Sequence, residues 1–225
     1  GRTSEPVGEV YASATPGTRL YTQREPVGVV AAITPWNFPI AIPAWKIAPA
    51  LAYGNTVLFK PAGATPLTAS HFVDALVDAG LPAGVLSLVF ASGPATSAAW
   101  IESGAADAVS FTGSEAAGRA LQQVATARHR KVQLELGGKN AVVVAPDADI
   151  ARAAEMIVRG AMASAGQKCT ATSRAIAIGA ALEPLRAAIA ERVAALRAGD
   201  PVDPATTFGP VIDGAARERI AGLVA

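Results

Sequence analysis

Short apolar runs alternate with longer amphipathic segments along the first 136 residues of the chain. The apolar runs are rich in β-branched residues, which is typical of strands that are buried on both faces. These predicted strands lie at 27–33, 56–60, 85–90, 106–111 and 132–136. Predicted helices lie between them at 40–53, 66–78, 94–102 and 115–127. The alternation predicts an α/β fold with right-handed βαβ crossovers and a mostly parallel sheet.

The pattern changes on both sides of this region. The first 26 residues are polar, and a short hairpin is predicted from strands at 7–11 and 19–24. Within the βαβ region itself, Pro43 and Pro49 predict that the helix at 40–53 has a kinked or shortened first part. Gly137 and Gly138 then separate the βαβ region from a second one, so we place a domain boundary there.

The second region repeats the strand and helix pattern with different spacing. Asp149 is predicted to cap its first helix. The predicted elements are strands at 140–144 and 175–179 and helices at 150–165, 183–196 and 214–225. Because the last helix runs to the final residue and the chain does not start with Met, we expect a fragment of a longer protein.

Composition excludes several classes of function. The chain is 51% hydrophobic and 16% charged, so it can bury a sizeable core. A net charge of +1 gives no basic surface for nucleic acid. His71 and His129 stand apart without carboxylates at ligand spacing, so no metal site is predicted. The apolar stretches are too short to span a membrane and no signal peptide is visible, so we expect a cytoplasmic protein without membrane partners.

The only cysteine, Cys169, lies on a predicted loop of small and polar residues between a helix and a strand. A single cysteine excludes internal disulfides and fits a reducing compartment. On such a loop the thiol is a candidate nucleophile. The alternative is that Cys169 is a small buried hydrophobic residue, as unpaired cysteines often are.

Four polar side chains follow or end predicted strands, where ligands of parallel sheets bind. Asn37 offers an N–H donor for an oxyanion, and Glu135 is a candidate general base. Lys60 and the segment 112–114, which ends at Ser114, suit a hydroxylated and phosphorylated ligand. Each residue also has a simpler interpretation. Asn37 then shapes a turn between prolines, and Glu135 is an exposed side chain on an edge strand. Lys60 is then an ordinary charge at the end of a strand, and Ser114 is a helix cap.

Some familiar signatures are absent. Cysteine and glutamate without a suitable histidine disfavour a protease-type pair. The stretch 160–168 differs from a phosphate loop in its spacing and in Cys169, which replaces Ser or Thr. No G-x-G-x-x-G occurs, so spacing alone does not predict a nicotinamide cofactor.

Five motifs, taken together and in this order, resemble the aldehyde dehydrogenase superfamily over nearly the whole chain. They are Thr34-Pro35-Trp36-Asn37-Phe38-Pro39, Lys60-Pro61, Phe111-Thr112-Gly113-Ser114, Leu134-Glu135-Leu136-Gly137-Gly138-Lys139 and Gly166-Gln167-Lys168-Cys169. The resemblance implies that Cys169 attacks the aldehyde carbon and that Asn37 and the Cys169 N–H stabilise the oxyanion. Hydride transfer to the nicotinamide then leaves a thioester, and Glu135 activates the water that hydrolyses it.

The resemblance also implies a variant Rossmann-type parallel-sheet domain without the glycine fingerprint, which binds NAD or NADP. Residues 1–136 then form part of this dinucleotide-binding domain, and 137–225 form part of an α/β catalytic domain. The implied cofactor-binding residues are Trp36, Lys60, Gly63, Gly113, Ser114 and Gly137. Many NAD-preferring relatives have a glutamate near the position of Gly63, so its absence here admits NADP.

The substrate implied is a small-molecule aldehyde. The run 166–174 and the alanine-rich composition resemble enzymes for carboxylated semialdehydes, such as 2-oxoglutarate or succinate semialdehyde. Arg174 is a candidate partner for a substrate carboxylate, with structural ion pairs as its alternative role. Glu135 disfavours the coenzyme A-acylating branch.

The resemblance further implies a homodimer or homotetramer. The later Glu-x-Phe-Gly-Pro segment of the family is not found, since 208–210 fits an earlier turn. Two other functions stay open at this point: a cofactor-independent thiol esterase that uses Cys169 and Glu135, and a non-catalytic relative.

Overall fold

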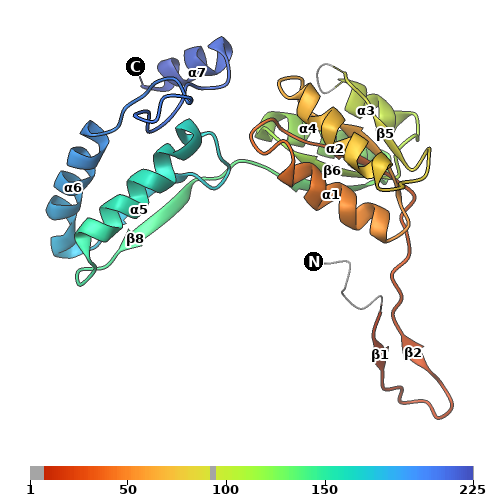
Figure 1. Cartoon of the computed structure of the whole chain (residues 1–225). Coiled ribbons are helices and arrows are strands. Elements are labelled where there is room, and N and C mark those ends of the chain that lie inside the picture. The colour runs from red at the N-terminus through yellow and green to blue at the C-terminus, as the bar shows by residue number, and fades with distance from the viewer. Residues whose placement is uncertain (1–7, 92–94, 225) are drawn as a thin grey trace. The chain divides into compact units, whose positions relative to one another are not determined.

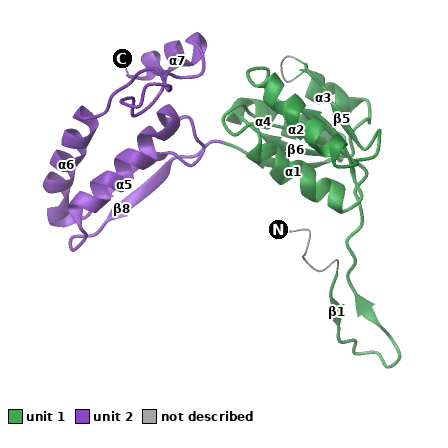
Figure 2. Ribbon diagram, in the orientation of Figure 1, with its two compact units in different colours: residues 1–136 green, residues 137–225 purple. Residues whose placement is uncertain are grey.

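The computed structural model describes residues 8–91 and 95–224 of the 225-residue chain. The chain divides into two compact units, residues 1–136 and 137–225 (Figure 2).

Figure 1 shows the first unit, in which helices cover a sheet. The sheet has five parallel strands in the order β5-β4-β3-β6-β7. The predicted α/β fold with a parallel sheet is therefore confirmed. In chain order the elements are β3 (Val29–Ile33), α1 (Ala41–Ala52), β4 (Thr56–Lys60), α2 (Pro66–Asp78), β5 (Leu86–Leu88), α3 (Ala95–Glu102), β6 (Ala108–Thr112), α4 (Glu115–Ala127) and β7 (Lys131–Glu135).

The central strand β3 contributes alternate side chains to two cores, one on each face of the sheet. Ala31 packs in one cluster with Ile101 of α3 and Leu121 of α4. Its neighbour Ala32 packs in the other cluster with Ile47 of α1 and residues of α2. Both alanines are fully buried. The unit therefore has three layers, with a helix pair on each face of the sheet, as the continuous apolar strands predict.

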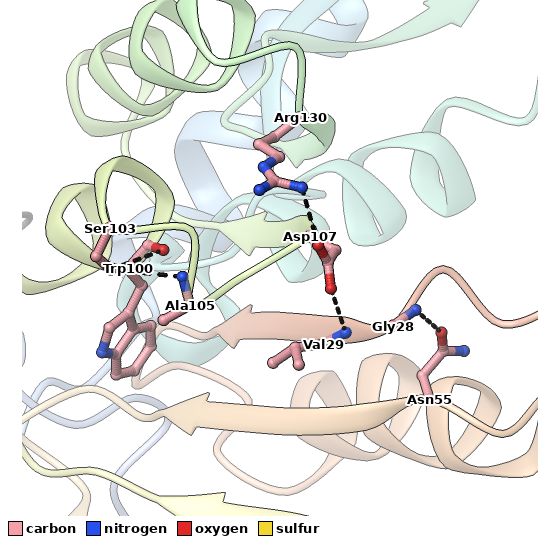
Figure 3. Close-up of polar contacts among 8 residues, drawn as sticks. All are labelled: Gly28, Val29, Asn55, Trp100, Ser103, Ala105, Asp107 and Arg130. Carbon is pink, nitrogen blue, oxygen red and sulfur yellow. Dashed lines mark hydrogen bonds and ion pairs between the residues drawn. The ribbon is translucent and has the colours of Figure 1, made fainter.

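Asn55 fixes the start of the central strand, at the amino ends of the sheet (Figure 3). Its Oδ1 accepts hydrogen bonds from the N–H of Val27 at 2.7 Å and of Gly28 at 3.2 Å. Its Nδ2 donates to the carbonyl of Ala50 in α1 at 2.9 Å. One buried amide side chain thus joins the chain before β3 to the end of α1.

Asp107 makes a second connection at this end of the sheet (Figure 3). Its Oδ2 accepts from the N–H of Val29 at 3.0 Å, and its Oδ1 accepts from Nη1 of Arg130 at 2.8 Å. Gly28 has a φ of +112°, and a Cβ on it would lie 2.3 Å from Asp107 Oδ2. Glycine is therefore required here both by the backbone conformation and by the close approach of the carboxylate.

A small antiparallel hairpin, β1 (Val10–Tyr11) and β2 (Leu20–Tyr21), precedes the sheet. The sequence predicts a hairpin in this region, but both strands are shorter than expected, and the predicted position at Val7 lies outside the described residues. The helix predicted over 40–53 is a single element, α1, whose first part is not shortened, with Pro43 in its first turn and Pro49 inside it. The position of Pro43 is tolerated because the first turn lacks intrahelical acceptors.

The second unit contains a two-stranded parallel sheet, β8 and β9, with α5 and α6 packed in one core that includes Val144, Ile157 and Leu185. Its elements are β8 (Asn140–Val144), α5 (Ile150–Met162), the 3-10 helix η2 (Ala163–Gly166), β9 (Thr172–Ala177), the 3-10 helix η3 (Gly179–Ala181), α6 (Leu182–Ala194) and α7 (Gly214–Val224). Asp149 caps α5 by accepting from the N–H of Arg152 at 3.0 Å.

The two predicted boundaries in this unit that differ most from the structure are each wrong by three residues. The helix predicted over 150–165 ends at Met162, because Ser164 and Ala165 have φ values of +57° and +54°, which no α-helix accommodates. The strand predicted over 175–179 begins earlier, at Thr172. Its polar first residues pair with β8, which the apolar pattern could not reveal because their side chains do not enter the core.

Across residues 8–91 and 95–224, the structure contains no helix that is both long and apolar enough to span a membrane.

The hydrogen bonds of Asn55 lead to a stability prediction. Asn55→Ala removes the acceptor of two part-buried hydrogen bonds and the donor of a third, so we expect the free energy of unfolding of the first unit to fall by about 1–3 kcal/mol. All three tryptophans lie in this unit, so tryptophan fluorescence during urea denaturation reports on it alone. Ser103→Ala, which removes two 3.4 Å contacts at an exposed turn, is the control and should change the value by less than about 0.5 kcal/mol. Equal effects of the two variants would contradict the assignment.

Candidate functional site

The order of the strands marks one place on the first unit as a candidate binding site. The central strands β3 and β6 pair in parallel, from Val30 with Ala108 to Ile33 with Phe111. After β3 the chain continues to β4 on one side, and after β6 it continues to β7 on the other. At such a reversal the two connections diverge beyond the carboxyl ends of the strands, where open parallel sheets bind ligands.

The first predicted site residues follow β3 directly. Trp36 and Asn37 are part-buried in the loop that joins β3 to α1. The loop begins at Thr34, whose N–H donates to the carbonyl of Lys60 at 3.2 Å and so joins the ends of β3 and β4. The Thr34 hydroxyl is buried and has no hydrogen-bond partner among the residues that the structure describes. A polar ligand or water is the kind of partner that such a group requires.

Lys60 is the last residue of β4, and only 9% of its surface is exposed. Burial disfavours the charged amine and lowers its pKa from the ordinary value. Gly63, three residues later, is exposed, and a Cβ on it would meet no atom within 4 Å. This position therefore has room for a side chain.

Gly113 and Ser114 form the turn from β6 into α4. The N–H of Gly113 donates to the carbonyl of Glu135 at 3.1 Å, which joins this turn to the end of β7. A Cβ on Gly113 would lie 2.6 Å from the ring of Phe111, so the turn is closed against that ring. Ser114 is the N-cap of α4 and accepts from the N–H of Ala117 at 3.4 Å. The N–H groups of this first helical turn and the helix dipole favour an anion here.

Glu135 ends β7 and is exposed on the edge of the sheet. A row of side-chain hydrogen bonds joins it to α1. Lys46 Nζ donates to Ser110 Oγ at 2.9 Å, Ser110 donates to Gln133 Oε1, and Gln133 Nε2 donates to Glu135 Oε1 at 3.0 Å. Because Glu135 Oε2 takes no part in this row, the carboxylate keeps an oxygen with which to accept a proton.

Lys46 is a titratable group that the sequence analysis missed. Burial lowers its pKa from 10.5 to about 8, and the nearby Glu135 carboxylate opposes this shift by favouring the charged amine. A signal was present in the sequence, since Lys46 is the only charged residue in α1 and lies between Trp45 and Ile47. Its partner Ser110 lies 64 positions away, and no local pattern predicts that pairing.

The second unit carries the candidate nucleophile. Cys169 is exposed and lies on the loop between η2 and β9. Asn140, the first residue of β8, donates from Nδ2 to the Cys169 carbonyl at 2.7 Å. Arg174 is exposed on β9, and Gly137 is the first residue of the unit.

The structure thus brings the five sequence motifs into two places. In the first unit, the residues at the carboxyl edge of the sheet are Trp36, Asn37, Lys60, Gly63, Gly113, Ser114 and Glu135. Gly137 and Cys169 belong to the second unit. Within the described part of the chain, no three His, Cys, Asp or Glu side chains are grouped so that they could hold a metal ion.

Comparisons with known proteins agree with one another. The sequence model of the aldehyde dehydrogenase family matches residues 2–225. The chain is 45% identical over 204 residues to the alpha-ketoglutaric semialdehyde dehydrogenase of Bacillus subtilis, which covers 91% of this chain and 42% of that protein. It is 46% identical over 208 residues to the 2,5-dioxopentanoate dehydrogenase of Saccharolobus solfataricus, and the matched segment covers 92% of this chain and 43% of that protein.

A similar solved structure is that of betaine aldehyde dehydrogenase from Staphylococcus aureus in complex with NAD+. It has a TM-score of 0.93 and 34% sequence identity, over 99% of this chain and 44% of that one. The chain spans less than half of the length of each of these relatives.

The burial of Lys46 leads to a pH prediction. An unfolded lysine titrates near 10.5 and folded Lys46 near 8, so between these values the unfolded chain binds more protons. The contribution of Lys46 to the free energy of unfolding therefore rises with pH between about 8 and 10.5. Lys46→Met removes the contribution, whereas buried Lys60 affects both proteins equally. We expect the wild type to gain stability relative to Lys46→Met from pH 8 to pH 10 in urea denaturation followed by tryptophan fluorescence. Parallel curves would show that Lys46 titrates normally.

Proposed function

The chain belongs to the aldehyde dehydrogenase family, and we propose that it carries the nucleophile, base and nucleotide-binding residues for NAD(P)-dependent oxidation of an aldehyde to a carboxylate. The observation that supports this best is the arrangement at one edge of the first unit. Donors, a base and a helix N-terminus all follow strands around the β3–β6 reversal. Neither a structural protein nor a simple esterase requires that combination.

The residues at this edge fit a nicotinamide dinucleotide. The first turn of α4 and the turn at Gly113, which closes against Phe111, suit the pyrophosphate. Lys60 suits the hydroxyls or a 2′-phosphate of the adenosine ribose, and Trp36 lies in the loop beside the predicted oxyanion donor. The bound nucleotide would supply the acceptor for the hydride that leaves the substrate.

The protein's own groups perform the acyl chemistry. The Cys169 thiolate attacks the aldehyde carbon, and the side-chain N–H of Asn37 stabilises the negative charge that develops on the substrate oxygen. Oxidation leaves the acyl group on Cys169 as a thioester. Glu135 then takes a proton from water, and the resulting hydroxide releases the carboxylic acid and frees the thiol. The Gln133 hydrogen bond to one carboxylate oxygen orients the base for this step.

The substrate that we propose is a carboxylated semialdehyde. Two similar proteins are named for alpha-ketoglutaric semialdehyde and 2,5-dioxopentanoate. Arg174 is exposed on β9, shortly after the nucleophile loop, and no ion pair involving it is present among the described residues. Its guanidinium is therefore accessible to a carboxylate, which it can bind through two parallel hydrogen bonds.

The experiment that tests this function follows the formation of reduced cofactor with NAD and with NADP, using the protein expressed from its complete gene. Short aliphatic, aromatic and carboxylated aldehydes are compared. We expect turnover with a carboxylated semialdehyde to exceed turnover with its uncharged analogue. Hydrolysis of esters without any nucleotide-dependent oxidation would instead indicate the thiol esterase.

Two variants separate the roles of the nucleophile and the base. Cys169→Ala should abolish oxidation and leave nucleotide binding unchanged, because it removes only the attacking group. Glu135→Gln should give one rapid burst of reduced cofactor and then a steady rate about 10²- to 10⁴-fold below wild type, since the thioester is no longer hydrolysed efficiently. Stopped-flow absorbance measures both phases. A normal steady rate in Glu135→Gln would exclude this residue as the base.

Gly63 provides a test of cofactor choice. A carboxylate introduced at this open position should repel a 2′-phosphate, so Gly63→Glu should reduce kcat/KM with NADP by about tenfold or more. The value with NAD should change much less. Gly63→Gln has nearly the same size without the charge and is the matched control. If both variants lower NADP activity equally, steric hindrance and not charge is responsible.

A further inference from the structure

The nucleophile loop has an unusual backbone a few residues before the cysteine. Ser164, Ala165 and Gly166 follow α5 with φ values of +57°, +54° and +70°. Consecutive left-handed residues cost free energy, particularly where they carry a Cβ. Such a segment persists only when the surrounding contacts determine its conformation. Neighbouring residues must therefore hold this loop in place.

Side chains supply several of these contacts. Gln167 Nε2 donates to the Ser164 carbonyl at 3.2 Å, and Gln167 Oε1 accepts from the N–H of Ile212 at 2.9 Å. Closer to the thiol, Asn140 Nδ2 donates to the Cys169 carbonyl at 2.7 Å and to the Ala171 carbonyl at 3.3 Å. The side-chain amide of Asn140 thus binds two carbonyls of the loop, that of Cys169 and that of Ala171, two residues later.

Asn140 is well placed to hold this loop because its own backbone is fixed. It is the first residue of β8 and pairs with Thr172, the first residue of β9, and the register shifts immediately after this pair. Gly138 lies close by: a Cβ on it would be 3.5 Å from the Cys169 oxygen. The segment before β8 therefore lies directly beside the peptide that follows the nucleophile.

We propose that Asn140 is a positioning residue: by binding the carbonyls of Cys169 and Ala171 it fixes the peptide after the nucleophile and thereby orients the thiol. Fixing the Cys169 carbonyl restricts ψ of Cys169, and with it the direction of the Cα–Cβ bond relative to the rest of the unit. Attack on a carbonyl depends steeply on that direction, and displacements near 1 Å cost about 10²-fold in rate. The catalytic part of this inference rests on the proposed function, whereas the loop contact does not.

Asn140→Asp is the informative change because it keeps the size of the side chain and replaces the donor by an acceptor facing two carbonyls. Asn140→Ala is the second variant and removes the contact without introducing a charge. The matched control is Ser173→Ala, since the Ser173 hydroxyl donates to the Ala171 carbonyl at 3.4 Å but makes no hydrogen bond to Cys169. Circular dichroism selects the variants that are folded.

The first measurement is amide hydrogen exchange in residues 168–171, made on the protein expressed from its complete gene. Both Asn140 variants should exchange about tenfold faster in this segment, and Ser173→Ala should resemble wild type. The second measurement is the burst of reduced cofactor before steady turnover. Its rate should fall about tenfold or more in the Asn140 variants, at unchanged nucleotide affinity and nearly unchanged KM. Glu135→Gln, by contrast, should keep the burst.

Unchanged amide hydrogen exchange in residues 168–171 of a folded Asn140 variant would show that Asn140 does not hold the loop. Faster exchange with a normal burst rate would overturn the orienting role. If the wild type oxidises no aldehyde, the proposed function fails, and the inference is then judged by exchange together with alkylation of Cys169 by iodoacetamide, followed on its tryptic peptide. A changed alkylation rate in both Asn140 variants but not in Ser173→Ala would support the positioning role, and an unchanged rate would overturn it.

Discussion

The parallel pairing of β3 between β4 and β6 is the constraint on which the first unit depends. Ala31 and Ala32 are fully buried on opposite faces of this strand, so the helices on both sides pack against it. Because all five strands run in the same direction, every loop that leaves a carboxyl end emerges at the same edge. Residues that are far apart in the sequence, such as Asn37 and Glu135, reach one edge only because this pairing holds.

Much of this unit could be predicted because each buried strand is a continuous apolar run, and the polar residues that follow such runs mark the carboxyl edge of the sheet. Lys46 could not be assigned, because its lowered pKa comes from tertiary burial, and Glu135, which opposes that shift, lies in a different element. The end of α5 could not be placed for a similar reason. Ser164 and Ala165 are ordinary helix residues by propensity, and nothing local in the sequence marks their left-handed conformation.

Phosphate binding without a glycine fingerprint is physically reasonable in this fold. The usual glycines let the backbone approach a pyrophosphate closely and let the helix pack closely on the strand. Here Gly113 lies against the Phe111 ring, and Gly118 would place a Cβ 2.5 Å from Leu136. Two glycines on either side of the α4 N-terminus therefore provide the close packing of turn and helix, although their spacing differs from the usual motif.

The two units solve different positioning problems. At the edge of the sheet, main-chain pairing between strands fixes the strand ends, and the strand ends fix the positions of the loop residues that follow them. The Cys169 loop lies outside any ladder, between a left-handed turn and the first residue of β9, and its backbone hydrogen bond from the N–H of Ala171 to the carbonyl of Lys168 at 3.1 Å is local to the loop. A side chain anchored on a strand can replace that pairing. Asparagine suits the role because its amide N–H groups can donate to two carbonyls at once, whereas an aspartate would repel both.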